Sequence, residues 1–302
     1  MAVQTSKVAS IEEWAAAPNI SARSVLVTII GDTLIPIDSS VWMSQILELS
    51  EGFGFSDRLV RTSMNRLVAE RWLYTERVGR QSRYHLTDVA LTESARAAER
   101  IYGSDRVDWS GEWVLVFLPA ELRAAESSTI VEHFRWNGFV PVASGVLASP
   151  RCTHDTAREL LAAVAPGVRP VIASANFTEL ESLVDDGFFL AKSDGDELTA
   201  AWLAFVERYE PLLPAAAVAS SVEAFGLRTM LIHDLRRIRL RWPPLPAQAH
   251  PTDWPGVSAS QIAAEMYSQL AERSAEWLSS IFAGEYPRAF PTRFAYDLEG
   301  RD

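Results

Sequence analysis

The sequence predicts an α+β protein made of three successive segments, and three observations support this prediction. Residues 21–103 show helical periodicity followed by two short alternating runs that carry arginines. In residues 104–193, strand-like and helical patterns follow one another, whereas residues 194–302 are helical in pattern. A chain of 302 residues, 48% of them hydrophobic, is long enough for two or three domains because a domain usually has about 100–200 residues.

The first segment begins with three predicted helices. Apolar residues at helical spacing extend from Ser21 to Leu34, where Pro36 ends the pattern. A second helix is predicted from residue 39 or 40 to residue 50 and is followed by glycines. Ser56 is a suitable N-cap for a third helix over residues 57–71.

The third helix has two different faces when its residues are placed on a helical wheel. The apolar face is formed by Val60, Met64, Leu67 and Val68. The opposite face carries the side chains that we predict to read DNA bases, namely Arg58, Arg61, Thr62 and Asn65. Side chains of these types form hydrogen bonds with base edges and with phosphates. For an isolated helix, the alternative is an ordinary solvated face.

A hairpin that follows this helix favours the DNA-binding interpretation. Residues 73–78 and 82–86 alternate like short strands around Gly79 and Arg80. Three arginines lie on the hairpin, and we expect Arg77, Arg80 and Arg83 to contact phosphates. Three helices and such a hairpin predict a winged helix-turn-helix with its third helix in the major groove.

The other two segments predict a sheet domain and a helical domain. After a helix over residues 88–102, the order is β-α-β-β-α-β, which is that of a ferredoxin-like sandwich. Its elements are predicted at 112–118, 120–136, 138–142, 144–148, 155–164 and 169–173. The last segment contains predicted helices at 197–209, 216–240 and 258–282.

The charge is unevenly distributed along the chain. The 28 basic and 39 acidic residues give a net charge of −11, which argues against a protein that coats nucleic acid or membrane surfaces. Residues 56–86, however, contain seven arginines and only three acidic residues. We therefore expect any polyanion to bind at this short segment.

Several classes of site are not predicted. The single cysteine, Cys152, excludes an intrachain disulfide and a cysteine-based zinc site and favours a cytoplasmic protein. The five histidines have no metal-binding spacing, and no glycine-rich phosphate loop is present. We therefore predict no enzyme activity, catalytic residue, metal or cofactor. With no apolar stretch of about 18 residues and no secretory signal pattern, we expect no membrane association.

Five stretches of the sequence resemble the PaaX family of phenylacetic-acid-degradation repressors. They are Ser21–Leu34, Ser56–Leu73, Arg77–Leu86, Ala224–Arg239 and Asp253–Gly256. The resemblance implies a bacterial repressor with an N-terminal winged helix-turn-helix, a central Cas2-like domain and a helical C-terminal domain. It also implies release from operator DNA by an aryl-CoA thioester, phenylacetyl-CoA. We expect a homodimer on a palindromic site in double-stranded DNA.

A basic cluster in the last segment is a candidate site for this acyl-CoA effector. The predicted ligand residues are Arg228, His233, Arg236, Arg237 and Arg239, because arginines bind phosphates well. The alternatives are that these residues stabilise a helix C-terminus or serve a domain or dimer interface. For the whole chain, the alternatives are a Cas2-like metal-dependent nuclease and an architectural DNA-binding protein. Against a nuclease, the first predicted strand of the middle segment ends without a carboxylate.

Overall fold

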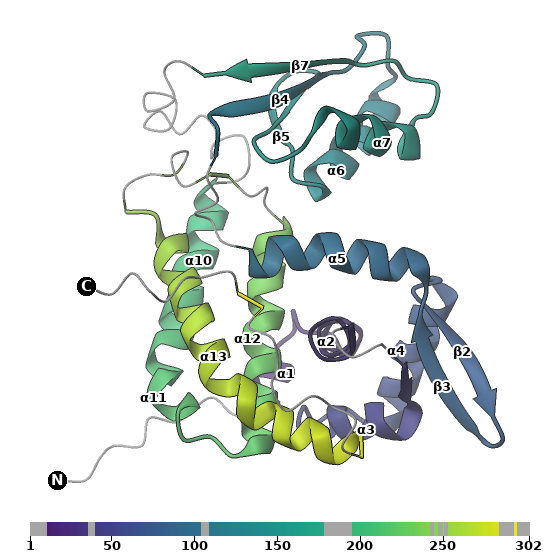
Figure 1. Cartoon of the computed structure of the whole chain (residues 1–302), viewed down its shortest axis with the longest axis vertical. Helices are drawn as coiled ribbons and strands as arrows, with labels where there is room; N and C mark the ends of the chain where they lie inside the picture. Colours follow the sequence, from purple (N-terminus) through teal and green to yellow (C-terminus); the bar gives the residue numbers. More distant parts are fainter. Residues whose placement is uncertain are drawn as a thin grey trace. The chain divides into compact units, whose positions relative to one another are not determined.

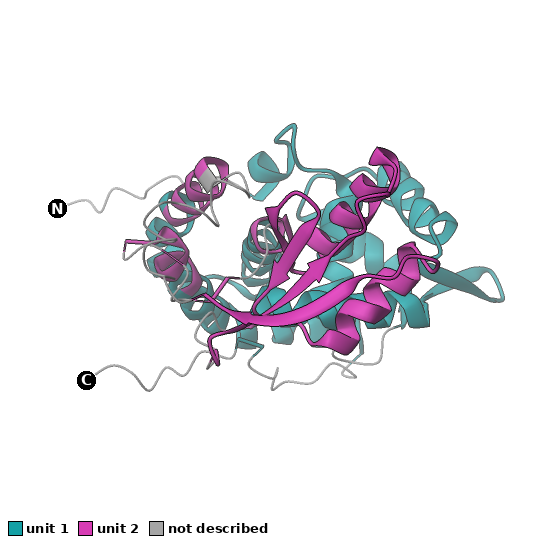
Figure 2. Cartoon of the chain, turned by 90° about the horizontal axis from the view of Figure 1, so that it is seen from above, with its two compact units in different colours: residues 1–102, 207–236, 261–302 teal, residues 103–206, 237–260 magenta. Residues whose placement is uncertain are grey.

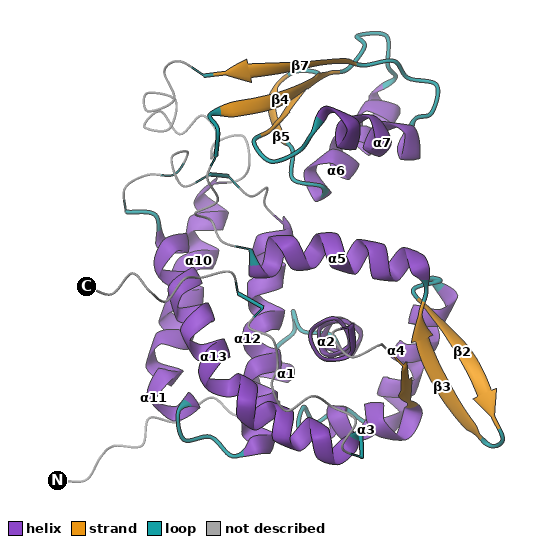
Figure 3. Cartoon of the chain, in the orientation of Figure 1, coloured by secondary structure: helices purple, strands orange, loops and turns teal. Residues whose placement is uncertain are grey.

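The computed structural model describes residues 11–35, 40–103, 109–177, 195–241, 245–246, 250, 253–283 and 293–294. The fold is α+β, with two small antiparallel sheets and many helices (Figure 3). Two compact units are distinguished in Figure 2. The first contains residues 1–102, 207–236 and 261–302, and the second contains residues 103–206 and 237–260. The first unit thus contains both N-terminal and C-terminal parts of the chain. Both predicted segment boundaries, at residues 104 and 194, lie outside the described residues.

The N-terminal part of the first unit is mainly helical. Its elements are α1 (Ile11–Ala15), α2 (Ala22–Ile29), the π-helical turn η1 (Ile30–Leu34), α3 (Met43–Glu51), α4 (Asp57–Ala69) and α5 (Asp88–Tyr102). The predicted first helix corresponds to α2 and η1, and the Ser21 hydroxyl caps it by accepting from the Ser24 amide. Helix α1 was not predicted, because five residues are too few to show a helical period.

The predicted hairpin belongs to a three-stranded antiparallel sheet. Strands β1 (Ser40–Trp42), β2 (Leu73–Val78) and β3 (Gln81–Leu86) lie in the order β1-β3-β2. A two-residue turn joins β2 to β3, and Gly79 has φ +61° there, a conformation that favours glycine. Strand β1 occupies the predicted start of the second helix, so α3 begins only at Met43.

Helix α4 packs through one face and leaves the other exposed. Val60, Met64 and Leu67 are buried, as the wheel predicts. The helix ends two residues earlier than predicted because Arg71 has a left-handed backbone, with φ +59°. Helix α2 contacts α4, and Figure 1 shows α2 between α4 and α12.

The second unit contains a four-stranded antiparallel sheet. Its elements are β4 (Glu112–Phe117), α6 (Ala124–Trp136), β5 (Val140–Ala143), β6 (Val146–Ser149), α7 (His154–Val164) and β7 (Val171–Asn176). The strand order is β5-β6-β4-β7, so the first and third strands of this segment are central. The element order agrees with the prediction, and β5, β6 and β7 each begin two residues later than predicted.

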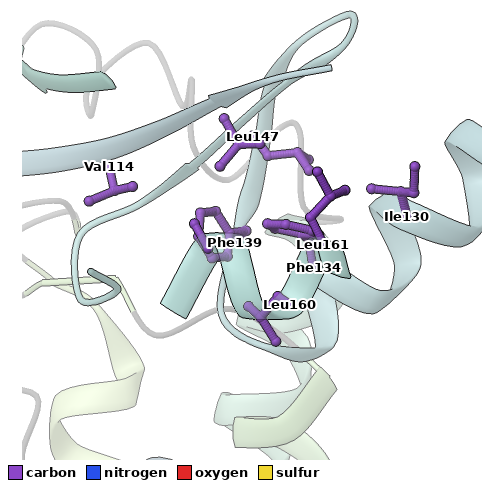
Figure 4. Packing of buried hydrophobic residues seen from close by; sticks show 9 residues of the cluster. Val114, Ile130, Phe134, Phe139, Leu147, Leu160 and Leu161 are labelled. Atoms are coloured by element: carbon purple, nitrogen blue, oxygen red, sulfur yellow. The ribbon is translucent and has the colours of Figure 1, made fainter. Parts of the chain in front are cut away.

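Both faces of this sheet are covered, which explains the continuous apolar run of β4. Side chains alternate between the faces of a strand. Val114 and Val116 therefore join a cluster with Phe134 of α6 and Leu161 of α7 (Figure 4). On the other face, Trp113 packs in a second cluster together with β5, β6 and Leu245.

The C-terminal elements are α10 (Gly195–Tyr209), the 3-10 turn η3 (Glu210–Leu212), α11 (Leu213–Ala216), α12 (Ser221–Arg241) and α13 (Pro255–Ile281). Helix α12 starts five residues later than predicted because Ser220 caps it. The Ser220 hydroxyl accepts from the Glu223 amide, and the Glu223 carboxylate accepts from the Ser220 amide. Among the described residues, no helix is long and apolar enough to cross a membrane.

Candidate nucleic-acid interface

The predicted base-reading residues lie together on the exposed face of α4. Arg58, Arg61, Thr62 and Asn65 are all exposed. The Ser56 hydroxyl caps the helix by accepting from the Leu59 amide. The Thr62 hydroxyl donates to the Arg58 carbonyl at 2.8 Å, so its oxygen keeps a free acceptor position. This face presents two cations and two polar groups to the solvent.

The hairpin arginines do not all lie on one side of the sheet. Arg77 is paired with Ser82, whereas Glu76 is paired with Arg83. Because side chains alternate along a strand, Arg77 and Arg83 project from opposite faces. Arg83 is half-buried, with its guanidinium carbon 5.5 Å from the centre of the Trp42 ring. Arg80 is exposed in the turn itself.

Arg61 of α4 lies near the inner face of this hairpin. Burial raises the pKa of the Tyr84 hydroxyl, and the smaller effect of the Arg61 charge opposes this rise. Tyr84 is buried on β3, on the same side of the sheet as Arg77. Tyr84 therefore lies within the range of the Arg61 charge and on the same side of the sheet as Arg77.

The positive charge of this face is not neutralised by its acidic neighbours. Glu70 forms an ion pair with Arg23, and Glu76 lies 3.1 Å from His85. Within the described residues, no salt bridge is formed by the four exposed arginines Arg58, Arg61, Arg77 and Arg80. The face is thus open to an anionic partner.

Three of the predicted ligand residues contact α2 and η1 inside the first unit. Arg236 donates to the Ser24 hydroxyl at 2.9 Å. His233 is fully buried, with Nδ1 3.2 Å from the Thr28 hydroxyl. The Thr28 hydroxyl also lies 3.1 Å from the Ser24 carbonyl, to which it can donate.

Arg228 belongs to a buried polar cluster around Asp32, a residue of η1. The Arg228 side chain is 1% exposed, and its Nε donates to the Asp32 carboxylate at 2.7 Å. The hydroxyls of Tyr102 and Tyr267 donate to the same carboxylate at 2.6 and 3.0 Å, and Arg293 lies 3.4 Å from it. The negative charge of Asp32 is thus well compensated.

Asp32 was not among the predicted site residues. The available signal is an acidic residue inside a run that is otherwise uncharged, Ser24–Leu34. A buried carboxylate requires a partner, but the sequence does not identify Arg228 as that partner, since 196 positions separate the two residues.

The other two predicted ligand residues, Arg237 and Arg239, belong to the second compact unit. Arg239 donates to the Gly103 carbonyl at 2.7 Å and to the Ser260 hydroxyl at 2.6 Å. Arg237 is exposed. Four of the five side chains are thus buried or half-buried in contacts within the protein, and that of Arg237 is exposed. No group of three or more metal-ligating side chains is found among the described residues.

Comparisons with known proteins identify the family. Residues 21–90 match the family model described as PaaX-like protein, and residues 193–280 match the one described as PaaX-like protein C-terminal domain. The chain is 30% identical to the transcriptional repressor PaaX of Escherichia coli over 281 residues, covering 89% of this chain and 87% of that protein.

A solved structure gives a likeness in fold alone. It is an uncharacterized protein from Mycobacterium tuberculosis, with 20% sequence identity and a TM-score of 0.50. The similarity covers 84% of this chain and 97% of that one. Both family models and the Escherichia coli relative agree on the assignment, and the chain belongs to the PaaX-like protein family.

Proposed function

We propose that this protein is a DNA-binding transcriptional repressor of an aromatic catabolic operon of the phenylacetate type. The observation that carries the proposal is the exposed face of α4, whose arginines form no salt bridge among the described residues of an acidic chain. Such a local basic face is the electrostatic footprint of nucleic-acid binding. The name of the Escherichia coli relative, a transcriptional repressor, supports the same function.

We assign a winged helix-turn-helix to the part of the chain from α2 to β3. The order of three helices and an arginine-bearing hairpin supports this assignment, with α4 entering the major groove. We assign a ferredoxin-like sandwich to β4–β7, which the strand order β5-β6-β4-β7 supports. The protein is proposed to act in the cytoplasm as a homodimer on a palindromic operator, with half-sites about one helical turn apart.

The proposed effector is an aryl-CoA thioester such as phenylacetyl-CoA, which releases the repressor from DNA. Release requires that the thioester bind more tightly to the form that does not bind DNA. The buried contacts of Arg228, His233 and Arg239 occupy these side chains within the protein. Of the predicted ligand residues, Arg237 is the one with an exposed side chain.

Fluorescence anisotropy with promoter DNA of the protein's own operon tests this function. Arg58→Ala and Arg61→Ala are each expected to weaken binding by about 1–3 kcal/mol, because each removes a contact to a base or a phosphate. Arg123→Ala is the matched control, since Arg123 is exposed and pairs with Glu126 at the start of α6. Wild-type affinity in both α4 variants would remove this helix from the interface.

The effector is tested in the same assay with phenylacetyl-CoA, free phenylacetate and CoA. Release from DNA by the thioester alone supports the proposed effector. If DNA binding is unchanged by the thioester, the repressor function stands and this effector is rejected. Absence of DNA binding at low salt would reject the repressor itself, because electrostatic binding is strongest under that condition. A nuclease assay with a divalent metal would then follow.

A further inference from the structure

Three polar contacts join α12 to α2 and η1, and we call them the α2–α12 seam. The seam consists of the pairs Ser24–Arg236, Thr28–His233 and Asp32–Arg228. All six residues belong to the first compact unit. On the side of α2 and η1, the three positions are four residues apart, so the contacts lie near the beginning, the middle and the end of this helical stretch.

Contacts at three points fix both the position and the orientation of α2 on α12. A rotation or a shift of α2 would separate at least one pair and leave buried polar groups without their partners, which is unfavourable. Purely apolar side chains would tolerate such a shift more easily, because they have no directional partners. A buried ion pair such as Asp32–Arg228 often adds little stability compared with apolar side chains. Fixing the geometry is therefore the better explanation for the seam.

Helix α2 connects the seam to the proposed DNA-binding surface. Val25 and Ile29 of α2 are completely buried, as are Met64 and Leu67 of α4, and the two helices contact one another. Close-packed apolar side chains transmit small displacements. Helix α2 thus contacts α4 through apolar side chains and α12 through the seam, and so links the two helices within the first unit.

We propose that Arg228, His233 and Arg236 are positioning residues for DNA binding. They do not touch DNA; they hold α2, and through it α4, in the orientation in which the exposed face of α4 fits the major groove. This inference rests on the proposed function and extends it. It assigns to α12 an indirect control over operator affinity, exerted through α2.

The test measures operator affinity by fluorescence anisotropy in two seam variants, Arg236→Ala and the double variant Asp32→Asn/Arg228→Met. The double variant removes both charges of the pair together, so neither Asp32 nor Arg228 is left as a buried charge without the other. Arg293 loses its carboxylate partner but keeps its hydrogen bonds to the Gly31 carbonyl and the Tyr102 hydroxyl. Each is expected to bind about three- to thirty-fold more weakly, while circular dichroism shows a folded protein well below its unfolding temperature. The dependence of affinity on salt should remain that of the wild type, because no phosphate contact is lost. Arg236→Lys, which keeps a donor for Ser24, should restore most of the affinity.

Arg273→Ala is the matched control for Arg236→Ala. Arg273 is also half-buried in the first unit and donates to backbone carbonyls, those of Ala216 and Ala219, without contacting α2. Its replacement should leave operator affinity unchanged. Wild-type affinity in both seam variants, or equal weakening by Arg273→Ala, would overturn the proposal. If the wild-type protein itself binds no promoter DNA, the proposed function fails and the positioning role fails with it.

Discussion

Gly226 shows how one residue determines a helix contact in the first unit. A Cβ atom at this position of α12 would lie 2.2 Å from Cδ1 of Ile11 in α1. Non-bonded carbon atoms do not approach so closely, so the tip of the Ile11 side chain occupies this place because residue 226 has no side chain. Glycine within a helix costs about 0.5–1 kcal/mol relative to alanine. The close packing of α1 accounts for its presence in this stretch.

The effect of Gly226→Ala on the free energy of unfolding is expected to have opposite signs with isoleucine and with alanine at position 11. In the wild-type background, Gly226→Ala should destabilise the protein by about 1–3 kcal/mol, because Ile11 must move. With Ile11→Ala already present, the same replacement should stabilise the protein by about 0.5–1 kcal/mol through helix propensity. Both changes in the free energy of unfolding are measured by urea denaturation of the wild type, Gly226→Ala, Ile11→Ala and the double variant. A stabilising effect in the wild-type background would show that α1 does not pack there.

Helix α2 depends on distant parts of the chain. It contacts α4 on one side, and its polar residues pair with α12 on another. Asp32 of η1 receives hydrogen bonds from Tyr267 of α13 and from Arg228 of α12. The N-terminal segment therefore shares its core with helices that lie more than 100 residues away in sequence.

A fragment of residues 11–103 is expected not to fold stably by itself. Removal of α12 and α13 takes away Arg228 and Tyr267, two partners of Asp32, and exposes to water a surface of α2 and η1 that is buried in the full chain. A small domain has only a few kcal/mol of stability to offset that loss. Thermal unfolding followed by circular dichroism would show a broad transition at low temperature, or none. An unfolding temperature equal to that of the full chain would contradict the shared core.

At the scale of the whole molecule, three buried tyrosines link stability to alkaline pH. Burial raises the pKa of Tyr102 and Tyr267 well above the usual value of 10.0, and Asp32, to which both hydroxyls donate, raises it further. Burial likewise raises the pKa of Tyr209, which donates to Met230 and to Asp234. In the unfolded chain, these hydroxyls ionise near pH 10.

Stability should therefore decrease as the pH rises above about 10. Below that pH, the folded and the unfolded state both keep the tyrosine protons, and the three hydroxyls make their full contribution to the free energy of unfolding. Above it, the unfolded state loses protons that the folded state keeps, so the free energy of unfolding falls. Absorbance at 295 nm follows tyrosine ionisation, and the share that belongs to the buried tyrosines should appear only when unfolding removes the helical signal. Tyr209→Phe should make this late share smaller. Complete ionisation near pH 10 in the folded protein would contradict this expectation.

The amino-acid sequence alone determined the type and order of most elements and the exposed polar face of α4. These features depend on residues that are close in sequence: Ser56 as an N-cap, the apolar period of α4, and Gly79 in a two-residue turn. Element boundaries were less accurate where a cap or a left-handed residue decides them, as at Ser220 and Arg71.

The tertiary structure alone decided how the basic residues of α12 are used and which segments share a core. Arginines of one helix have the same local sequence pattern whether they bind a ligand or a buried carboxylate. Arg228 is buried because Asp32, 196 positions away, is buried beside it. The division of the sequence into predicted segments does not indicate that these two residues form a pair. Desolvation makes a buried charge depend on its partner, and partners distant in sequence are brought together only by the packed fold.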